Sequence, residues 1–202
     1  MTDEKLPEES RSRVSRRTLL KLTGAGAAIA WTTPIISSVR MPAFAQTSVP
    51  CGQNVFIDDF EAETCGLSMT SLTKWNVSGS SVDIIGNGCP VPFVNAPGKV
   101  VDLDGTPCTT TTLDLSTIMD FGPGTYQVQF VLGGSQRGDA PNTVQVTLGS
   151  LNETFTIASN DPLTTYVRSA VVSSTEKLHF IAPSNGDCIG ALLDDVSVNL
   201  CG

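Results

Sequence analysis

Histidine is almost absent from this 202-residue chain, which contains only His179. A single His excludes a His-rich metal site. It also means that a Ser-His-Asp triad would have to use His179, because no other His is present. Cys-x-x-Cys pairs are also absent, and no His lies at zinc-ligand spacing from a Cys, which argues against a structural zinc site. Because His179 alternates with apolar neighbours, we expect its side chain to be exposed.

Basic residues are scarce after residue 45. Residues 1–45 hold seven of the 12 Lys and Arg and four of the 20 Asp and Glu, so residues 46–202 hold five basic and 16 acidic residues, a formal charge of −11. So acidic a body repels a phosphate backbone, which excludes nucleic acid as a partner. This length forms one domain of ordinary size, and it shows no internal repeat or linker.

A long hydrophobic run is missing as well. Residues 22–39 are only mildly apolar, since Gly, Thr and Pro interrupt them. A membrane-spanning helix needs about 20 predominantly apolar residues, so we do not expect an integral membrane protein once this segment is removed.

The N-terminal segment has the pattern of an export signal. Residues 15–21 read Ser-Arg-Arg-Thr-Leu-Leu-Lys, which resembles the bacterial twin-arginine signal with Arg16 and Arg17 as its arginine pair. Residues 43–45, Ala-Phe-Ala, place small residues at the −3 and −1 positions of a signal-peptidase site. We therefore predict that residues 1–45 are a cleaved twin-arginine-type signal peptide and that 46–202 is secreted or displayed at the cell surface. The alternatives are a disordered basic tail or an uncleaved anchor.

The body is predicted to be an all-β domain. Apolar and polar residues alternate in 126–132, 143–148 and 152–157, and the Gly-Ser pair between the last two predicts a hairpin. Further strands are expected at 54–60, 81–85, 99–103, 166–172, 176–182 and 191–200, and one short helix-like stretch at 113–119. Short strands separated by Gly- and Pro-rich turns predict an antiparallel β-sandwich.

All six cysteines lie in the body, and an even number in an exported domain predicts disulfides. Six cysteines permit 15 pairings. Facing residues of an antiparallel pair have a constant sum of residue numbers. The sums are 252 for Cys51 with Cys201 and 253 for Cys65 with Cys188, so both pairs fit one register between 51–65 and 188–201, give or take a bulge. We therefore favour these two bridges, which leave Cys89 to Cys108.

The same register would gather acidic side chains. We expect Asp58 to face Asp194 or Asp195, with Asp59, Glu61 and Glu63 close by, and neither segment contains a base. Facing like charges repel, and a cluster of carboxylates suits Ca²⁺. The candidate ligands of a structural calcium ion are Asp58, Asp59, Glu61, Asp194 and Asp195; the alternative is that these acids point into solvent.

Five segments in order resemble the galactose-binding-like jelly-roll superfamily: Phe-Ile-Asp-Asp-Phe-Glu at 56–61, Trp75, Val-Asp-Leu-Asp-Gly at 101–105, Pro-Gly-Thr-Tyr-Gln-Val-Gln-Phe at 123–130 and Leu-Leu-Asp-Asp-Val-Ser-Val at 192–198. The superfamily includes carbohydrate-binding modules and exported bacterial surface domains. The resemblance covers roughly 54–200 and implies a jelly-roll sandwich for 46–202, with calcium joining the first and last strands at Glu61 and Asp195. Asp58 or Asp59 would contribute, although 57–59 depart from the Asn-Gly-x pattern of the superfamily.

Several residues have a plain structural interpretation beside a functional one. Trp75 could stack on a sugar but is expected in the core. Tyr166 and Arg168 are expected near the surface. The Arg-Gly-Asp triplet 137–139 resembles an adhesion motif, although three residues in a Gly-rich loop are usually a chance match. Asp102 and Asp104 could form a glycosidase carboxylate pair, but 102–105 also has the pattern of a strand-end turn.

The predicted function is therefore an exported, non-catalytic binding module for carbohydrate or another cell-envelope glycan, with structural calcium. A structural or adhesive surface protein without a small ligand is the alternative, and a glycan-active enzyme comes third. The ligand-binding residues and the oligomeric state do not follow from the sequence.

Overall fold

The computed structural model describes residues 51–91 and 96–201, and the predicted signal peptide lies outside them. The described residues form strands and loops and contain no helix. The strands are β1 (Cys51–Asp58), β2 (Gly66–Met69), β3 (Trp75–Ser78), β4 (Val82–Gly86), β5 (Lys99–Asp102), β6 (Leu113–Thr117), β7 (Gly124–Gly133), β8 (Asn142–Leu148), β9 (Leu151–Ile157), β10 (Thr164–Val172), β11 (His179–Ala182) and β12 (Leu192–Cys201).

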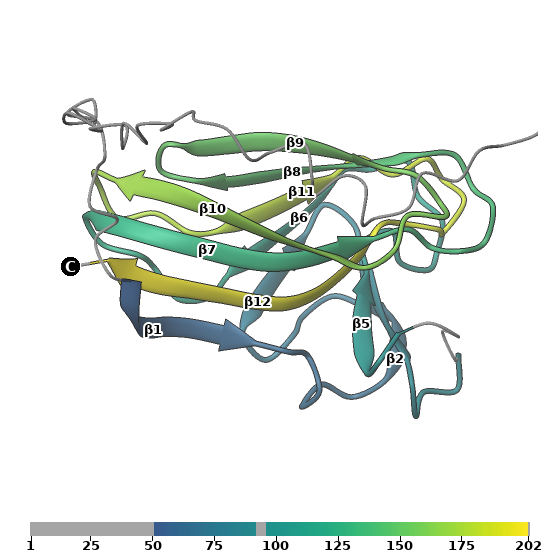
Figure 1. Ribbon diagram of the computed structural model, residues 1–202. Coiled ribbons are helices and arrows are strands. Elements are labelled where there is room, and N and C mark those ends of the chain that lie inside the picture. Colours follow the sequence, from purple (N-terminus) through teal and green to yellow (C-terminus); the bar gives the residue numbers. More distant parts are fainter. Residues whose placement is uncertain (1–50, 92–95, 202) are drawn as a thin grey trace, which may run out of the picture. The chain divides into compact units, whose positions relative to one another are not determined.

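Two antiparallel sheets form the predicted sandwich (Figure 1). The larger sheet has the order β10-β7-β12-β5-β4-β2, with β1 added along β12. The smaller sheet has the order β3-β6-β11-β8-β9. Strands that are neighbours in one sheet thus come from distant parts of the chain, and most of the loops gather at the two ends of the sandwich.

The core lies where the alternating strands predict it. In β7 the inward residues Tyr126, Val128 and Phe130 are buried, and in β8 Val144 and Val146 are buried. Alternation with period two puts one set of side chains against the facing sheet and leaves the other set on the outer face. The polar residues that alternate with these core residues in β7 therefore lie on the outer face of the larger sheet.

Trp75 is a core residue, as predicted. It is 1 % exposed and packs against Phe56, Phe60 and Phe180, with ring centroids 5.3, 6.0 and 5.8 Å away. Its indole Nε1 donates a 2.7 Å hydrogen bond to Asp58 Oδ2. The indole N–H is thus satisfied inside the sandwich, as a buried Trp requires, and no ring face remains for a sugar.

The helix-like stretch 113–119 is instead strand β6, and the prediction of a helix was wrong. Leu113 and Leu115 both point into the core with period two, and β6 pairs with β3 on one side and with β11 on the other. Ladder hydrogen bonds on both edges override a weak local preference for helix.

The two ends of the domain form one antiparallel pair, as predicted, and Cys51 is bonded to Cys201. The predicted register is wrong further along the strand. Irregularities after Cys51 and after Asn54 shift the pairing, so that Asp58 faces Val196 rather than Asp194 or Asp195. A bulge inserts a residue on one strand only, which changes the sum of facing numbers.

The other two predicted disulfides are also wrong: the bridges are Cys65–Cys89 and Cys108–Cys188. Strand β1 ends at Asp58, and the chain turns at Phe60, whose φ is 55°. Cys65 therefore leaves the β1–β12 ladder and directly precedes β2, which pairs with β4 and so brings Cys65 to Cys89. The Cys65–Cys89 bridge therefore depends on the turn at Phe60, and a prediction that continues one register from Cys51 to Cys65 leaves this turn out.

Among the described residues there is no helix with the length and apolar character needed to cross a bilayer.

Candidate functional site

The outer face of the larger sheet carries a row of amide and hydroxyl side chains. Gln127 and Gln129 of β7 point outward because their neighbours fill the core. Gln127 lies between Ser169 of β10 and Asn199 of β12 in the register of the sheet. Amide and hydroxyl groups both donate and accept hydrogen bonds without a net charge, so this face offers paired donors and acceptors.

Aliphatic side chains are interleaved with this row. Gln129 lies between Val167 and Ser197, and Ile57 of β1 continues the same row beyond Ser197. Val167 is 45 % exposed and Ile57 60 % exposed. The face thus combines small apolar contacts with uncharged hydrogen-bonding groups, which is the composition of many small-molecule sites.

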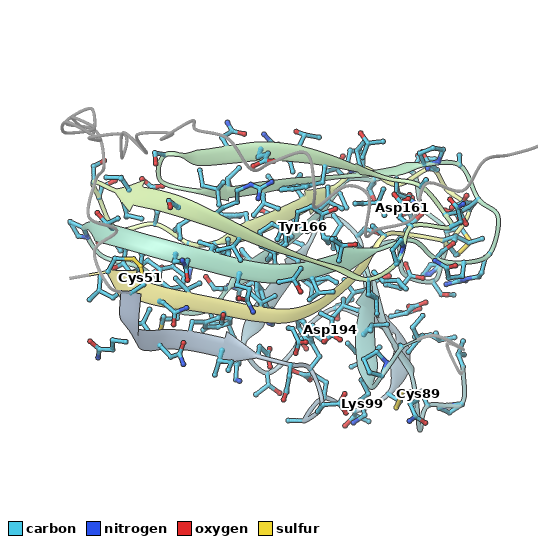
Figure 2. All side chains as sticks on the ribbon, in the orientation of Figure 1. Cys51, Cys89, Lys99, Asp161, Tyr166 and Asp194 are labelled. Atoms are coloured by element: carbon cyan, nitrogen blue, oxygen red, sulfur yellow. A yellow bond between two sulfur atoms is a disulfide. The ribbon has the colours of Figure 1, made fainter. Side chains whose placement is uncertain are left out.

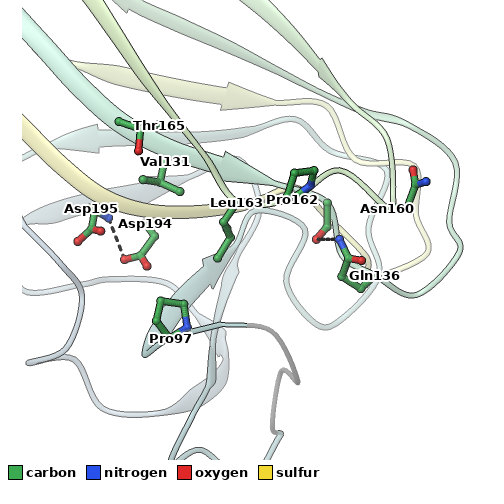
Figure 3. A pocket seen from close by; sticks show the side chains of 10 residues that line it. Pro97, Val131, Gln136, Asn160, Pro162, Leu163, Thr165, Asp194 and Asp195 are labelled. Atoms are coloured by element: carbon green, nitrogen blue, oxygen red, sulfur yellow. Dashed lines mark hydrogen bonds between the residues drawn. The ribbon is translucent and has the colours of Figure 1, made fainter. Parts of the chain in front are cut away.

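A pocket of about 500 Å³ opens at one end of this face (Figure 3). Val131 and Thr165 continue the outward columns of β7 and β10 into it. Two adjacent loops form its rim, one through Gln136 and the other through Pro162 and Leu163, while Pro97 lies apart from them. The pocket and the amide row form one continuous surface, since both belong to the outward side of the same strands.

Asp194 and Asp195 both line this pocket, although neighbours on a regular strand point to opposite faces. The pairing of β12 with β7 is irregular between Asp194 and Ser197, and Asp195 has a φ of 47°. A bulge of this kind re-aims a side chain, and such bulges are common beside binding sites. The irregularity is what places two adjacent carboxylates on one cavity.

The rim loops are fixed to each other. The backbone N–H of Gln136 donates to the Ser159 carbonyl over 2.7 Å. The side-chain amide of Gln136 donates to the Asp161 carbonyl over 2.9 Å. The Gly134 N–H donates to the same Asp161 carbonyl, and a Cβ on Gly134 would lie 2.1 Å from the Ala158 carbonyl oxygen. Only glycine allows this close approach. The pocket rim is therefore preorganised.

Burial raises the pKa of Asp194 to about 7. The Asp195 N–H donates to Asp194 Oδ1 over 2.8 Å and lowers the pKa, while the charges of Asp195, Glu61 and Asp59 raise it further. The carboxyl thus changes between neutral and charged forms near neutral pH. Its role in binding changes with it, from a hydrogen-bond donor to a charged acceptor.

The predicted calcium ligands are only partly brought together. Asp58 is buried and accepts hydrogen bonds from Trp75 and from Lys74 Nζ, the latter over 3.3 Å. Asp59, Glu61, Asp194 and Asp195 interact electrostatically. Within the described residues, however, no three Asp, Glu, His or Cys side chains converge as metal ligands.

Bases from other strands enter this region, a feature that the sequence pattern did not reveal. Lys99 Nζ of β5 donates to the carbonyl oxygens of Glu61 and Glu63, each over 2.7 Å, and the Lys99 N–H donates to Glu61 Oε1 over 2.7 Å. Figure 2 shows Lys99 near Cys89 on the β5 side of Asp194. Two ammonium groups, of Lys74 and Lys99, thus compensate part of the acidic charge.

Asp102 and Asp104 do not form a glycosidase pair, because both are almost fully buried, at 1 % and 2 % exposed. Asp102 accepts hydrogen bonds from the N–H groups of Asp104 and Gly190 and a 2.6 Å bond from Arg137. Burial raises the pKa of Asp102 to about 7 in spite of these donors. No substrate reaches either carboxyl in this arrangement.

The Arg-Gly-Asp triplet is engaged inside the protein. Arg137 bonds to Asp102, and Asp139 accepts hydrogen bonds from Ser135 and Asn142. Both charged side chains of the triplet therefore hold the loop in place, which removes the reason to interpret it as an adhesion motif.

The remaining predicted surface residues lie on two strands: His179 on β11, at the centre of the smaller sheet, and Tyr166 and Arg168 on β10, at the edge of the larger sheet. His179 is partly exposed and bonds through Nδ1 to Asp114 over 2.8 Å. Arg168 pairs with Glu153, with Nη2 2.7 Å from Oε1, and its guanidinium lies over the rings of Phe155 and Tyr166. Tyr166 is half-buried on β10 (Figure 2). None of these residues lines the pocket.

No family model matches this sequence, and no curated protein matches it. Similar solved structures include a cleaved adhesin domain of Lys-gingipain from Porphyromonas gingivalis, with 17 % identity and a TM-score of 0.47 over 73 % of this chain and 99 % of that one. The C-terminal family 22 carbohydrate-binding module of Clostridium thermocellum Xyn10B has 13 % identity and a TM-score of 0.47 over 74 % and 95 %. The CBM22-1 xylan-binding domain of Paenibacillus barcinonensis Xyn10C has 16 % identity and a TM-score of 0.46 over 74 % and 96 %. Similarity at this level concerns the sandwich and identifies no ligand of this chain.

Proposed function

We propose that this protein is an exported, non-catalytic module that binds carbohydrate on the outer face of its larger sheet. The observation that carries the proposal is the row of uncharged amide and hydroxyl groups leading into a pocket with two carboxylates. Sugar hydroxyls donate and accept at once, so they suit Gln127, Gln129, Ser169 and Asn199 as partners. The exposed Val167 offers an apolar contact for a ring face.

The carboxylates of the pocket support binding rather than glycoside cleavage. A glycosidase places its two carboxyl groups on either side of the scissile bond. Asp194 and Asp195 are instead neighbours on one strand, and the N–H of one donates to the carboxylate of the other. In this arrangement they accept hydrogen bonds from the same side of a ligand.

The test is retention of polysaccharides by the full chain, with matched variants on the two sheets. The double variant Gln127→Ala/Gln129→Ala removes the centre of the row and is expected to weaken binding about thirtyfold, since each of the two lost hydrogen bonds contributes about 1 kcal/mol. Gln145→Ala is the control, because Gln145 lies on the smaller sheet and bonds to Asn152. Equal binding by both variants would contradict the proposal, and failure to bind any glycan would favour a structural surface protein.

Export by the twin-arginine route is part of the proposal. Three disulfides in the described domain suit an oxidising compartment. Replacing Arg16 and Arg17 with Lys is expected to leave the precursor in the cytoplasm, which cell fractionation measures. Normal export of the double variant would contradict the twin-arginine assignment, without bearing on the binding face.

Structural calcium at Asp58, Asp59, Glu61, Asp194 and Asp195 remains a prediction, although Asp58 already accepts hydrogen bonds from Trp75 and Lys74. Burial is the main cause of the raised pKa of Asp194, and the charges of Asp195, Glu61 and Asp59 raise it further, which favours a cation. The hydrogen bonds that Lys99 makes to Glu61 act against it, because the ammonium already supplies positive charge. The calcium titration described below includes variants of this cluster.

A further inference from the structure

Asp104 is a buried carboxylate without a hydrogen-bond partner. The residue is 2 % exposed, and neither Oδ1 nor Oδ2 accepts a hydrogen bond from any described residue. Asp102, two positions earlier, is equally buried but has three donors. An ionised carboxylate without partners in a protein interior is strongly unfavourable, so Asp104 is either neutral or bound to a group that is not part of the chain.

The surroundings of Asp104 supply oxygen atoms and negative charge. Burial raises the pKa of Asp104, the Ser184 hydroxyl opposes this effect, and the nearby charge of Asp187 raises the pKa further. The amide of Ile189 also favours the charged form, and Asp83 disfavours it. No Lys or Arg of the described residues is among these principal influences, and Arg137 is bonded to Asp102 instead.

The loop that carries Ser184 and Asp187 is held in place independently of Asp104. The Cys108–Cys188 disulfide ties it to the segment after Asp104, with a Cα–Cα distance of 4.5 Å. Asn142 donates to the Ile189 carbonyl, and the Gly190 N–H donates to Asp102. These links fix the oxygen-bearing side chains beside the unpartnered carboxylate, which preorganises the place for a ligand.

We infer that Asp104 and Asp187, with the Ser184 hydroxyl, bind a hard divalent cation, Ca²⁺ by its chemistry, that fastens the 184–189 loop to the end of β5. All three donors are oxygens, which suit Ca²⁺ rather than Zn²⁺. Two carboxylates balance the charge of the ion, and Ca²⁺ accepts carbonyl and water oxygens for its remaining positions. This site is separate from the Asp194 cluster and does not depend on the proposed carbohydrate binding.

The test is calorimetric titration of the chelator-treated full chain with CaCl₂, together with melting curves in calcium and in chelator. Asp104→Asn keeps the size of the side chain and removes its charge, and it is expected to remove one equivalent of bound calcium together with the part of the rise in melting temperature that this ion causes. Asp187→Asn changes an exposed residue, so it leaves the fold intact, and it is expected to weaken calcium binding roughly 10- to 100-fold. Asp114→Asn, on the smaller sheet, is the matched control and is expected to bind calcium as the unchanged protein does.

Two outcomes would overturn the inference. If the unchanged protein neither binds calcium nor melts higher in calcium, Asp104 is a neutral buried acid. If calcium binding survives in Asp104→Asn and Asp187→Asn but is lost in Glu61→Gln and Asp195→Asn, the ion belongs to the cluster beside the pocket. Magnesium in place of calcium serves as a selectivity arm, and tighter binding of Mg²⁺ than of Ca²⁺ would also contradict the assignment.

Discussion

Asp102 and Asp194 lie on neighbouring strands of the larger sheet, and burial raises the pKa of each to about 7. Asp102 is enclosed: its donors are Arg137 and two backbone N–H groups. Asp194 lines an open pocket, and its strongest charged neighbours are other acids. Both shifts lower the stability of the folded protein as the pH rises from 4 to 7, but only the carboxyl that lines an open pocket is also placed to change what the protein binds.

The largest expected effect is the pH dependence of stability from Asp102. Between pH 4 and pH 7 the folded protein keeps a proton on this carboxyl that the unfolded chain has released, so stability falls as the pH rises and levels off above pH 7. The loss is up to about 4 kcal/mol, from 1.36 kcal/mol per pKa unit. Urea unfolding from pH 4 to pH 8 measures it, and Asp102→Asn is expected to flatten the curve. Parallel curves for the two proteins would show that Asp102 does not titrate in this range.

Removal of the Arg137 guanidinium is expected to have the next largest effect. Arg137→Met leaves Asp102 without its cation, so the free energy of unfolding is expected to drop by about 3 kcal/mol at pH 8. The drop is expected to be smaller at pH 5, where the carboxyl is neutral. Arg168→Met is the control: it breaks a partly exposed ion pair with Glu153 and is expected to cost less than about 1 kcal/mol at either pH.

The smallest effect is expected in binding and concerns Asp194, whose raised pKa also contributes to the fall in stability between pH 4 and pH 7. Above pH 7 the ionised carboxyl accepts stronger hydrogen bonds from ligand hydroxyls, so glycan affinity is expected to rise about fivefold between pH 6 and pH 8, or about 1 kcal/mol. Asp194→Asn is expected to remove this pH dependence. Affinity that rises equally in the variant would mean that another group titrates, and the contrast with Asp102 would then fail.

Much of the fold could be predicted because it depends on local patterns. Alternation in 126–132 identified the core side of β7, and the tendency of large aromatic side chains to be buried correctly predicted Trp75 as a core residue. Leu113 and Leu115 also alternate, but one short window does not distinguish a strand from a helix turn. Only the ladders to β3 and β11 settle that segment as a strand.

The proposed binding face was available in the sequence but was not identified there. The alternation that buries Tyr126, Val128 and Phe130 necessarily exposes Gln127 and Gln129. The pocket had no comparable signal. Its rim comes from loops far apart in the chain, and its two carboxylates share a cavity only because β12 is irregular at Asp195.

The sequence by itself determined the all-β class, the side of the strongly alternating strands that faces the core, and the meeting of the two ends at Cys51 and Cys201. These follow from a period of two and from the pairing of the first and last strands. Only the tertiary structure decided the partners of Cys65 and Cys108, the place of Lys99 among the acids and the isolation of Asp104. Each of these depends on where a strand bulges or ends, and one shifted or turned residue redirects every side chain that follows it.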